Sequence, residues 1–200
     1  MIDKKIEMYK KMIFLALLGL SLKGFSQGAA IYNNNPWIVG FGLSAIDDSG
    51  SKLGDFFKFN KSYHFSLPFK ASVEKRFKDD FGWQANLSTN IFKEGKIYNE
   101  GVLEEDISFF AIDIMAKYYA TNLFMNKYRA FFEGYGTVGI GRSFYDWKGG
   151  NTINIGGGLN FYIINNVRFF AQALAKISTT NSNLATNYFQ YDFGFIYRLN

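Results

Sequence analysis

The chain has 200 residues, 20% of them aromatic, and its formal net charge is +5. This length is enough for one domain with a sizeable hydrophobic core. The sequence contains no cysteine, which excludes disulfide bonds and thiolate metal sites.

Residues 1–26 have the features of a secretory signal peptide. A lysine-rich segment precedes an apolar run over 12–22, and Gly24 and Ser26 occupy the −3 and −1 positions of a cleavage site. The apolar run is much shorter than the ~20 residues that a membrane-spanning helix needs. Either Met1 or Met8 fits as the start of this signal. The sequence therefore predicts export, with residues 1–26 cleaved and a short periplasmic segment over 27–36.

Most of the positive charge belongs to this signal. It contains five of the 22 basic and two of the 17 acidic residues, which leaves 17 and 15 and a net charge of +2. A nucleic-acid-binding function loses its main support, because that function requires a basic surface on the folded protein.

Beyond the signal, apolar and polar residues alternate with a period of two, which predicts strands with one apolar and one polar face. Eight such segments follow in chain order, at residues 37–46, 65–77, 81–91, 109–120, 129–141, 153–163, 167–177 and 188–199. Most have roughly the ten residues that a tilted strand needs to cross a bilayer. Pro68 lies near the start of its strand, where a bulge would accommodate it.

The fifth segment contains "GYGTVGIG", in which Gly134, Gly136 and Gly139 have the spacing of the dinucleotide-binding fingerprint. That fingerprint requires a helix directly after the glycines. Here the alternation continues through the glycines into a turn over 145–150 and another strand. The sequence therefore predicts no nucleotide site, and the glycines are expected to make room for neighbouring aromatic rings and to permit curvature.

The connections alternate in length. Residues 47–64, 92–108 and 178–187 form long polar connections, whereas 78–80 and 163–166 form short ones, with 121–128 and 145–150 between these extremes. Outer-membrane barrels have long loops outside the cell and short turns in the periplasm. The pattern predicts an all-β, eight-stranded antiparallel up-and-down transmembrane barrel over residues 37–200, with both chain ends in the periplasm.

The distribution of charge indicates which face points outward. The apolar face carries one charge, Lys75, near a strand end, and an eight-stranded barrel is too narrow to enclose all the aromatic residues of that face. The polar face carries eleven charged residues of both signs: Lys70, Glu74, Arg76, Asp113, Lys117, Arg129, Glu133, Arg168, Lys176, Asp192 and Arg198. We therefore expect the apolar face to contact lipid and the lumen to hold compensating ion pairs. A soluble lipocalin-like barrel, with its apolar face inside, is the alternative.

Aromatic residues gather near both predicted rims, as expected for girdles at the headgroups. Those at the periplasmic rim are Trp37, Phe77, Phe81, Tyr118 and Tyr197. Those at the extracellular rim are Phe65, Phe144, Tyr145, Trp147 and Phe189.

The segments "LPFKASVEKRF", "FFAIDIMAKYY", "GYGTVGIG", "INIGGGLNFYI" and "DFGFIYRL" resemble the OmpA-like outer-membrane β-barrel domains, including the PorT-like small barrels. The resemblance covers about residues 30–200. It implies insertion by the barrel-insertion machinery, because Asp192, Gly194, Tyr197 and Leu199 resemble the C-terminal signal that this machinery reads. The sequence departs from that signal in ending on Leu-Asn instead of an aromatic residue. The resemblance does not imply that this protein has the peptidoglycan-binding activity of OmpA.

Three classes of function remain open. The first is a structural or interaction role in the envelope, with partners at the loops or the periplasmic rim, and the resemblance adds an accessory or anchor of a larger complex. The second is a narrow pore for small solutes, which would require the lumen charges to rearrange. We expect no cofactor and no metal, and lipids of the outer membrane as the surrounding medium.

The third class is a lipid-modifying enzyme, which needs a nucleophile and a base within hydrogen-bonding distance. The single histidine, His64, lies close in sequence to Ser66. Acidic residues at 47–48 and 104–106 are the other candidates for acid–base or calcium chemistry. Loop acids are usually solvated and a lone rim histidine is usually structural, so the sequence predicts a protein that is not an enzyme.

Overall fold

The computed structural model of the chain describes residues 36–48, 63–78, 80–98, 101–123, 125, 130–180 and 187–199. The expected signal peptide, the periplasmic segment up to residue 35 and Arg129 lie outside the described residues. No helix within the described part of the chain is long and apolar enough to cross a membrane.

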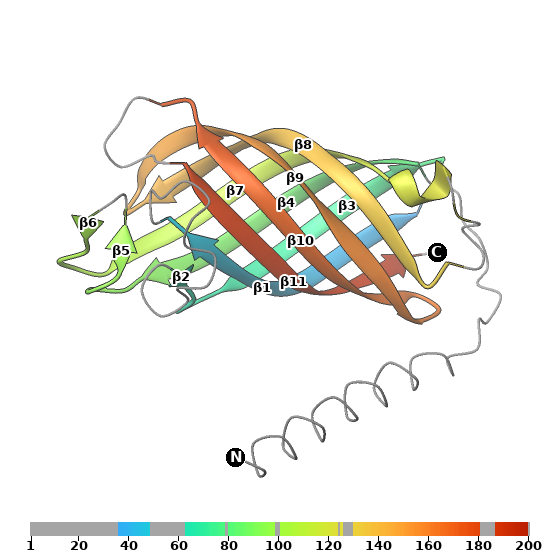
Figure 1. The fold of residues 1–200 in the computed structure, drawn as a ribbon, viewed down its shortest axis with the longest axis horizontal. Coiled ribbons are helices and arrows are strands. Elements are labelled where there is room, and N and C mark those ends of the chain that lie inside the picture. Colours follow the sequence, from blue (N-terminus) through green and yellow to red (C-terminus); the bar gives the residue numbers. More distant parts are fainter. Residues whose placement is uncertain are drawn as a thin grey trace, which may run out of the picture.

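Eight long antiparallel strands close into a barrel (Figure 1). They are β1 (Trp37–Asp47), β3 (Phe69–Phe77), β4 (Phe81–Phe92), β7 (Ile107–Tyr118), β8 (Phe132–Tyr145), β9 (Lys148–Ile164), β10 (Val167–Ser178) and β11 (Tyr188–Leu199). Each long strand pairs with the next along the chain, and β11 returns to pair with β1 from Trp37↔Leu199 to Asp47↔Phe189. The predicted eight-stranded up-and-down barrel is confirmed.

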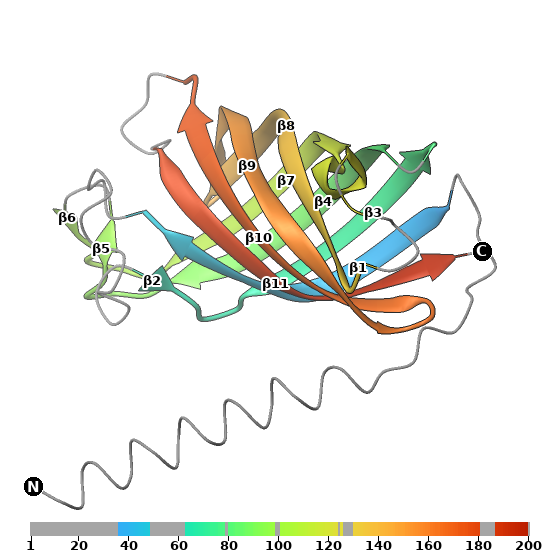
Figure 2. The same ribbon diagram turned by 45° about the vertical axis from the view of Figure 1, so that its right-hand side comes forward.

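Both ends of the barrel sequence lie at one end of the cylinder, which we name the terminal end because Trp37 and Leu199 lie there. A short 3-10 helix, η2 (Ala120–Leu123), lies at the terminal end as well (Figure 2). The opposite, loop end carries three two-residue strands: β2 (Tyr63–His64), β5 (Ile97–Tyr98) and β6 (Gly101–Val102). β5 and β6 form a separate hairpin.

The predicted strand over 65–77 is interrupted in the structure. β3 begins at Phe69, and β2 continues the same pairing on β1, from Leu43↔Phe69 to Ile46↔His64. From His64 to Phe69 the chain advances five residues, whereas the paired stretch of β1, from Ile46 to Leu43, covers only three. The extra residues between His64 and Phe69 therefore bulge out of the ladder. Asn90 stabilises this bulge, because its amide donates to the Ser44 and His64 carbonyls at 3.0 and 2.8 Å and accepts from the Ser66 amide at 3.1 Å.

The hairpin between β8 and β9 is tighter than the sequence indicates. β8 begins at Phe132 instead of residue 129, and the turn expected over 145–150 contains only Asp146 and Trp147. Both turn residues have positive φ, 45° and 69°, which matches the hairpin turn whose twist suits the flanking strands. Strand pairing runs directly through the three glycines of the fingerprint spacing, and the next element is strand β9, so the prediction of a strand at these glycines is confirmed.

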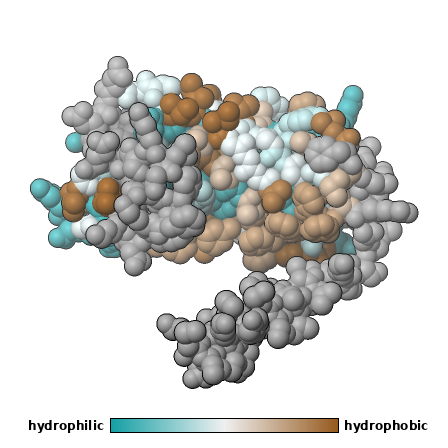
Figure 3. All heavy atoms as spheres, viewed as in Figure 1, coloured by the Kyte–Doolittle hydropathy of each residue, from teal (hydrophilic) through white to brown (hydrophobic). Residues whose placement is uncertain are grey.

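The two faces of the wall differ in burial as the alternation predicts. The charged residues predicted for the polar face are buried in the lumen wherever the structure describes them, for example Glu74 and Asp192 at 1% exposure each. Apolar residues such as Phe195 and Ile155 are more than half exposed on the outside. Figure 3 shows brown and tan residues over much of the visible wall. The protein therefore has an apolar exterior and a polar interior.

Candidate functional site: the lumen and its aromatic cap

The lumen near the terminal end is crossed by ion pairs that converge on Glu133. Arg76 from β3 donates to both Glu133 carboxylate oxygens at 3.0 Å, and Arg168 from β10 donates to one of them. Each guanidinium also faces an aromatic ring, with 3.5 Å from Arg76 Cζ to the Tyr119 centroid and 4.1 Å from Arg168 Cζ to that of Tyr162. The Arg76–Glu133 pair reaches across the lumen from β3 to β8, and together these contacts fix the side chains.

A second carboxylate, Glu74, lies beside this group. It accepts hydrogen bonds from Lys117 at 3.0 Å and from the Tyr119 hydroxyl, and one of its oxygens lies 3.7 Å from Arg76 Nε. Gly82 lies opposite Arg76 in the β3–β4 ladder, diagonally next to Glu74, and a Cβ at position 82 would lie 2.6 Å from a Glu74 carboxylate oxygen. A glycine at position 82 therefore provides the space that Glu74 occupies.

Two simpler pairs lie in the lumen toward the loop end. Lys70 from β3 donates to Asp192 on β11, which also accepts from Gln172 and Gln190. Lys176 from β10 donates to both oxygens of Asp113 on β7 at 2.9 and 2.8 Å. All four charged side chains are buried, so each pairing offsets a desolvation cost that an isolated charge would not recover.

An aromatic cluster closes the lumen at the loop end. Its buried members, which we name the aromatic cap, are Ile46, Phe92, Tyr98, Leu103, Phe109, Ala111, Tyr145 and Tyr188. Phe92 stacks on Phe109 with centroids 5.2 Å apart, and Tyr98 from the β5–β6 hairpin lies 5.8 Å from Phe92. The hairpin thereby folds inward over the barrel mouth and places Tyr98 in the cap.

The prediction that Tyr145 belongs to the extracellular girdle is wrong. Tyr145 is 1% exposed in the aromatic cap, and its hydroxyl donates to Asp48 at 3.3 Å. Its position could have been found from the sequence, because Tyr145 shares the parity of Glu133 and Tyr135 on the lumen face of β8. The sequence gives no such signal for Tyr98 and Leu103, which come from a connection outside the barrel wall.

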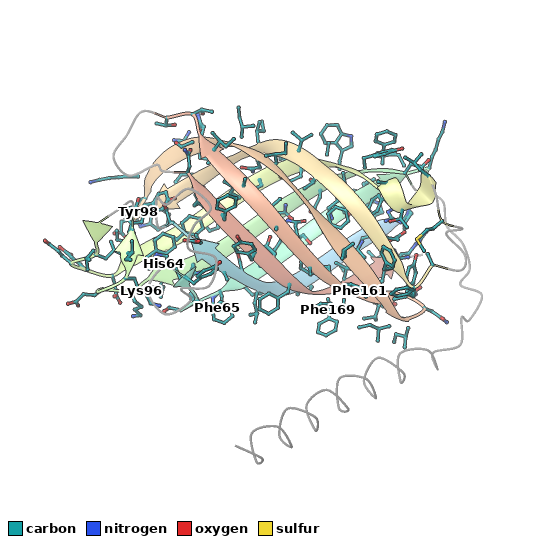
Figure 4. The ribbon with its side chains drawn as sticks, viewed as in Figure 1. His64, Phe65, Lys96, Tyr98, Phe161 and Phe169 are labelled. Carbon is teal, nitrogen blue, oxygen red and sulfur yellow. The ribbon has the colours of Figure 1, made fainter. Side chains whose placement is uncertain are left out.

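His64 packs against the aromatic cap and does not lie at a solvated rim. Its ring stacks on Phe92 with centroids 3.9 Å apart, and Nε2 lies 3.1 Å from the Ile97 carbonyl (Figure 4). Burial lowers the pKa of His64 from its ordinary 6.5 to about 4, with nearby Lys96 contributing in the same direction. His64 is therefore neutral at physiological pH and connects the β5–β6 hairpin to the barrel.

The geometry does not bring His64 and Ser66 together as a catalytic pair. His64 is 1% exposed with its ring inside the cap, whereas Ser66 is exposed in the bulge and its amide donates to Asn90. Among the acidic candidates, Asp106 is paired with exposed Lys93 at 2.5 Å, and Glu104 and Glu105 are exposed. Within the described ranges, no group of three histidine, aspartate or glutamate side chains could hold a metal ion.

The exterior carries the rest of the predicted girdles. Trp37, Phe77, Phe81 and Tyr197 are 45–57% exposed at the terminal end, and Phe65 and Trp147 are exposed at the loop end. Figure 4 shows Phe65 and Phe169 projecting away from the wall.

Three charges, instead of the single one predicted, lie on the exterior face of the long strands: Asp47 at the loop end of β1, Lys75 and Arg142. Lys75 lies over the Trp37 ring, 5.1 Å from its centroid. Because β8 extends past residue 141, Arg142 also faces outward, where it lies over Phe144 and donates to Asn151.

No protein-family model matches the chain, and no curated protein matches its sequence. Solved structures do share the fold. OprG from Pseudomonas aeruginosa superposes with a TM-score of 0.58 at 14% identity, over 87% of this chain and 99% of that one. The N-terminal β-barrel domain of OprF from the same organism gives 0.54 at 11%, over 84% and 98%. Neisserial surface protein A gives 0.55 at 11%, over 84% and 98%.

At these identities the comparison concerns the fold alone. It supports the resemblance to OmpA-like small outer-membrane barrels and does not single out the PorT-like ones. The chain shares the closed eight-stranded barrel fold with solved outer-membrane proteins such as OprG.

Proposed function

We propose that this protein is an integral outer-membrane β-barrel with a structural or interaction role in the envelope. Its apolar wall contacts lipid, and its loops and terminal rim are the surfaces available to partners. An accessory or anchoring role in a larger envelope complex is the specific form of this proposal that the resemblance favours.

The observation that carries the proposal is the filled lumen. Buried side chains in ion pairs occupy the lumen, and the aromatic cap covers its loop end. An eight-stranded barrel is only wide enough for such side chains to fill it. A filled lumen favours a protein that acts through its surfaces over one that passes solutes.

Two measurements test this role. In planar lipid bilayers, the purified barrel should give no steady single-channel conductance; a stable conductance at neutral pH would replace the proposal with a narrow pore. Crosslinking in native outer membranes followed by purification should recover a defined partner in fixed proportion. Recovery of the barrel alone, under conditions that preserve known envelope complexes, would count against an anchoring role.

We also propose an orientation, in which the terminal end faces the periplasm and residues 1–26 are removed on export. The tight Phe77–Phe81 and Ile164–Val167 turns at that end support this orientation, as does the larger size of most connections at the loop end. Protease added to intact cells should cleave only at the loop end, in the connections over residues 49–62 and 181–186. Cleavage of an epitope tag appended after Asn200 in intact cells would reverse the orientation.

The C-terminal strand is the proposed contact with the barrel-insertion machinery. In β11, Asp192 and Gly194 face the lumen whereas Tyr197 and Leu199 face outward, which presents the apolar residues of the signal on one side. Leu199→Asp should slow insertion in cells, while the same change at the exposed turn residue Trp147 should not. Equal insertion of both variants would remove the support for this contact.

A further inference from the structure

Arg142 is an exterior charge at the boundary between the apolar wall and the loop-end rim. Ile112 lies opposite it on β7, and Ile140 precedes it by two residues on the same face of β8. These isoleucines are 47% and 66% exposed. On the side toward the loop end, Phe144 packs against Phe110 with ring centroids 5.9 Å apart. Aromatic rings beside an apolar band mark the depth of the lipid headgroups, so Arg142 lies at this depth.

The Arg142 side chain lies along the outer wall of β9. One of its terminal nitrogens donates to the Asn151 carbonyl oxygen at 3.4 Å, and its Cζ lies 5.4 Å from the Phe144 centroid. A Cβ at Gly149 would lie 2.9 Å from Arg142 Nε, so this glycine provides the space that the side chain occupies. These contacts position the guanidinium beside the wall before any ligand arrives.

Arg142 has no acidic partner among the described residues. Its hydrogen bond to Asn151 leaves its other N–H donors unused by the described protein. Asp146, the acidic residue nearest to it in sequence, instead accepts from the Ser108 amide at 2.9 Å. The connection over 181–186 at the same end contains no acidic residue. Arg142 therefore presents a positive charge and donors that an external anion can use.

A second cation at the same rim is compensated within the protein. Lys93, which follows β4, pairs with Asp106 at 2.5 Å, and the two side chains are 50% and 46% exposed. Lys93 therefore has its counter-charge in the chain itself. Arg142 lacks such a carboxylate, and a charge beside the apolar band of a membrane protein is costly unless a partner compensates it.

We propose that Arg142 binds the phosphate of an anionic lipid headgroup. The planar guanidinium presents paired N–H donors that match phosphate oxygens, and the Asn151 amide lies beside it as a neutral donor. A lipid fits better than a soluble anion, because the exposed Ile112 and Ile140 side chains can contact the acyl chains of the same molecule. The proposal rests on the proposed membrane barrel, and in the proposed orientation this lipid belongs to the outer leaflet.

Native mass spectrometry of the detergent-folded protein tests the site, with phosphatidic acid and phosphatidylcholine of the same acyl chains as the two probes. The wild type should bind one phosphatidic acid more tightly than phosphatidylcholine by about five-fold, the contribution of one basic side chain at an anionic surface. Arg142→Gln should lose this preference. Lys93→Gln makes the same change in net charge at the same rim, so it is the matched control and should keep the preference.

Two outcomes of this measurement would overturn the proposal. The first is the absence of a preference in the wild type, or an equal preference in Arg142→Gln. The second is an equal loss in Arg142→Gln and Lys93→Gln, which would show general attraction by charge instead of a site.

Insertion into vesicles separates the lipid site from the membrane barrel on which it rests. The wild type and both variants should insert into phosphatidylcholine vesicles, because all three have the same apolar wall. Failure of the wild type to insert would contradict the membrane barrel itself. Adding a minor fraction of phosphatidic acid should then raise the unfolding midpoint of the wild type and of Lys93→Gln more than that of Arg142→Gln. Normal insertion with an equal rise in all three would contradict the lipid site alone.

Discussion

Neighbouring residues on one strand of this barrel have opposite surroundings. On β10, Gln172 is buried in the lumen, where it accepts from the Tyr135 hydroxyl at 3.0 Å and donates to Asp192 at 3.2 Å. Ala173, the next residue, lies on the exterior between Gly157 of β9 and Tyr191 of β11. The effect of a new charge should therefore change sharply over one residue.

Ala173→Arg should impair insertion or stability more than Gln172→Arg. A charge on the lipid side near mid-membrane costs about 2–4 kcal/mol. An arginine at position 172 enters a lumen where Asp192 already accepts hydrogen bonds and can pair with it. Denaturant titration of both variants folded into lipid vesicles would rank them. The reverse ranking would mean that the faces are inverted and that a lipocalin-like soluble barrel is the better description.

The environment of His64 predicts a pH dependence. Its folded pKa of about 4 lies below the ordinary 6.5, so the unfolded chain takes up a proton first as pH falls. The stability contributed by the neutral ring is complete above about pH 6.5 and is lost as pH falls toward 4. The loss is at most ~3 kcal/mol, from the size of the shift.

His64→Phe keeps a ring against Phe92 and removes the titrating group, so its unfolding free energy should fall less than that of the wild type between pH 6.5 and 4. Urea titrations at several pH values would measure the difference, and carboxylate titration should be common to both proteins. Superimposable pH profiles would show that the His64 ring is already solvated in the folded protein.

At the scale of elements, the β8–β9 hairpin has a turn with an unusual composition. Asn-Gly and Asp-Gly are the favoured pairs for a two-residue turn with two positive φ values, yet Trp147 occupies the second position with φ 69°. A bulky residue in this conformation is strained. The Trp147 ring is 93% exposed, so burial in the protein does not offset the strain.

Trp147→Gly should raise the free energy of unfolding by about 1 kcal/mol, because glycine adopts the left-handed conformation without strain. Trp147→Ala removes the same ring and keeps the strain, so it separates the backbone effect from any contact of the ring with headgroups. Equilibrium unfolding of the three proteins in vesicles would test this. A glycine variant no more stable than the alanine variant would exclude turn strain as the cause.

The elements also differ in how far the sequence predicts them. The faces follow from a period of two that the long strands keep, so the described lumen charges on these strands were predicted. Asp48, which is expected from the sequence to be solvated, is instead 0% exposed beside Tyr145. The β2–β3 bulge was only indicated, by Pro68, because its size depends on how Asn90 bridges β4 and β1. The partners within the lumen were not predicted, because the stagger around the barrel decides that Arg76 meets Glu133, 57 residues away.

At the scale of the whole molecule, closure is what makes the sheet compatible with a membrane. Every long strand has two neighbours, and the β1–β11 ladder of eleven residue pairs leaves no free edge. In a bilayer, unpaired backbone groups would cost several kcal/mol each, so the barrel should open only cooperatively.

Cooperative opening predicts heat-modifiable migration on gels. Unheated and boiled samples of the detergent-folded protein should migrate at different positions on the gel. The unheated sample keeps the compact barrel, because the barrel resists the gel detergent until it is heated. A variant with Gly42→Trp, in which the new side chain would meet the backbone of β11, should lose the compact band at a lower temperature. Identical mobility of boiled and unboiled wild type would count against a closed barrel.

The most direct test of the central claim, an apolar wall in lipid around a filled polar lumen, is a nitroxide accessibility scan along β10. The sequence has no cysteine, so single-cysteine variants at Ala171, Gln172, Ala173, Leu174 and Ala175 each carry one label. In vesicles, labels at 171, 173 and 175 should be accessible to oxygen and protected from a water-soluble nickel reagent, whereas those at 172 and 174 should be immobile and shielded from both. An inverted or absent two-residue period would contradict the account.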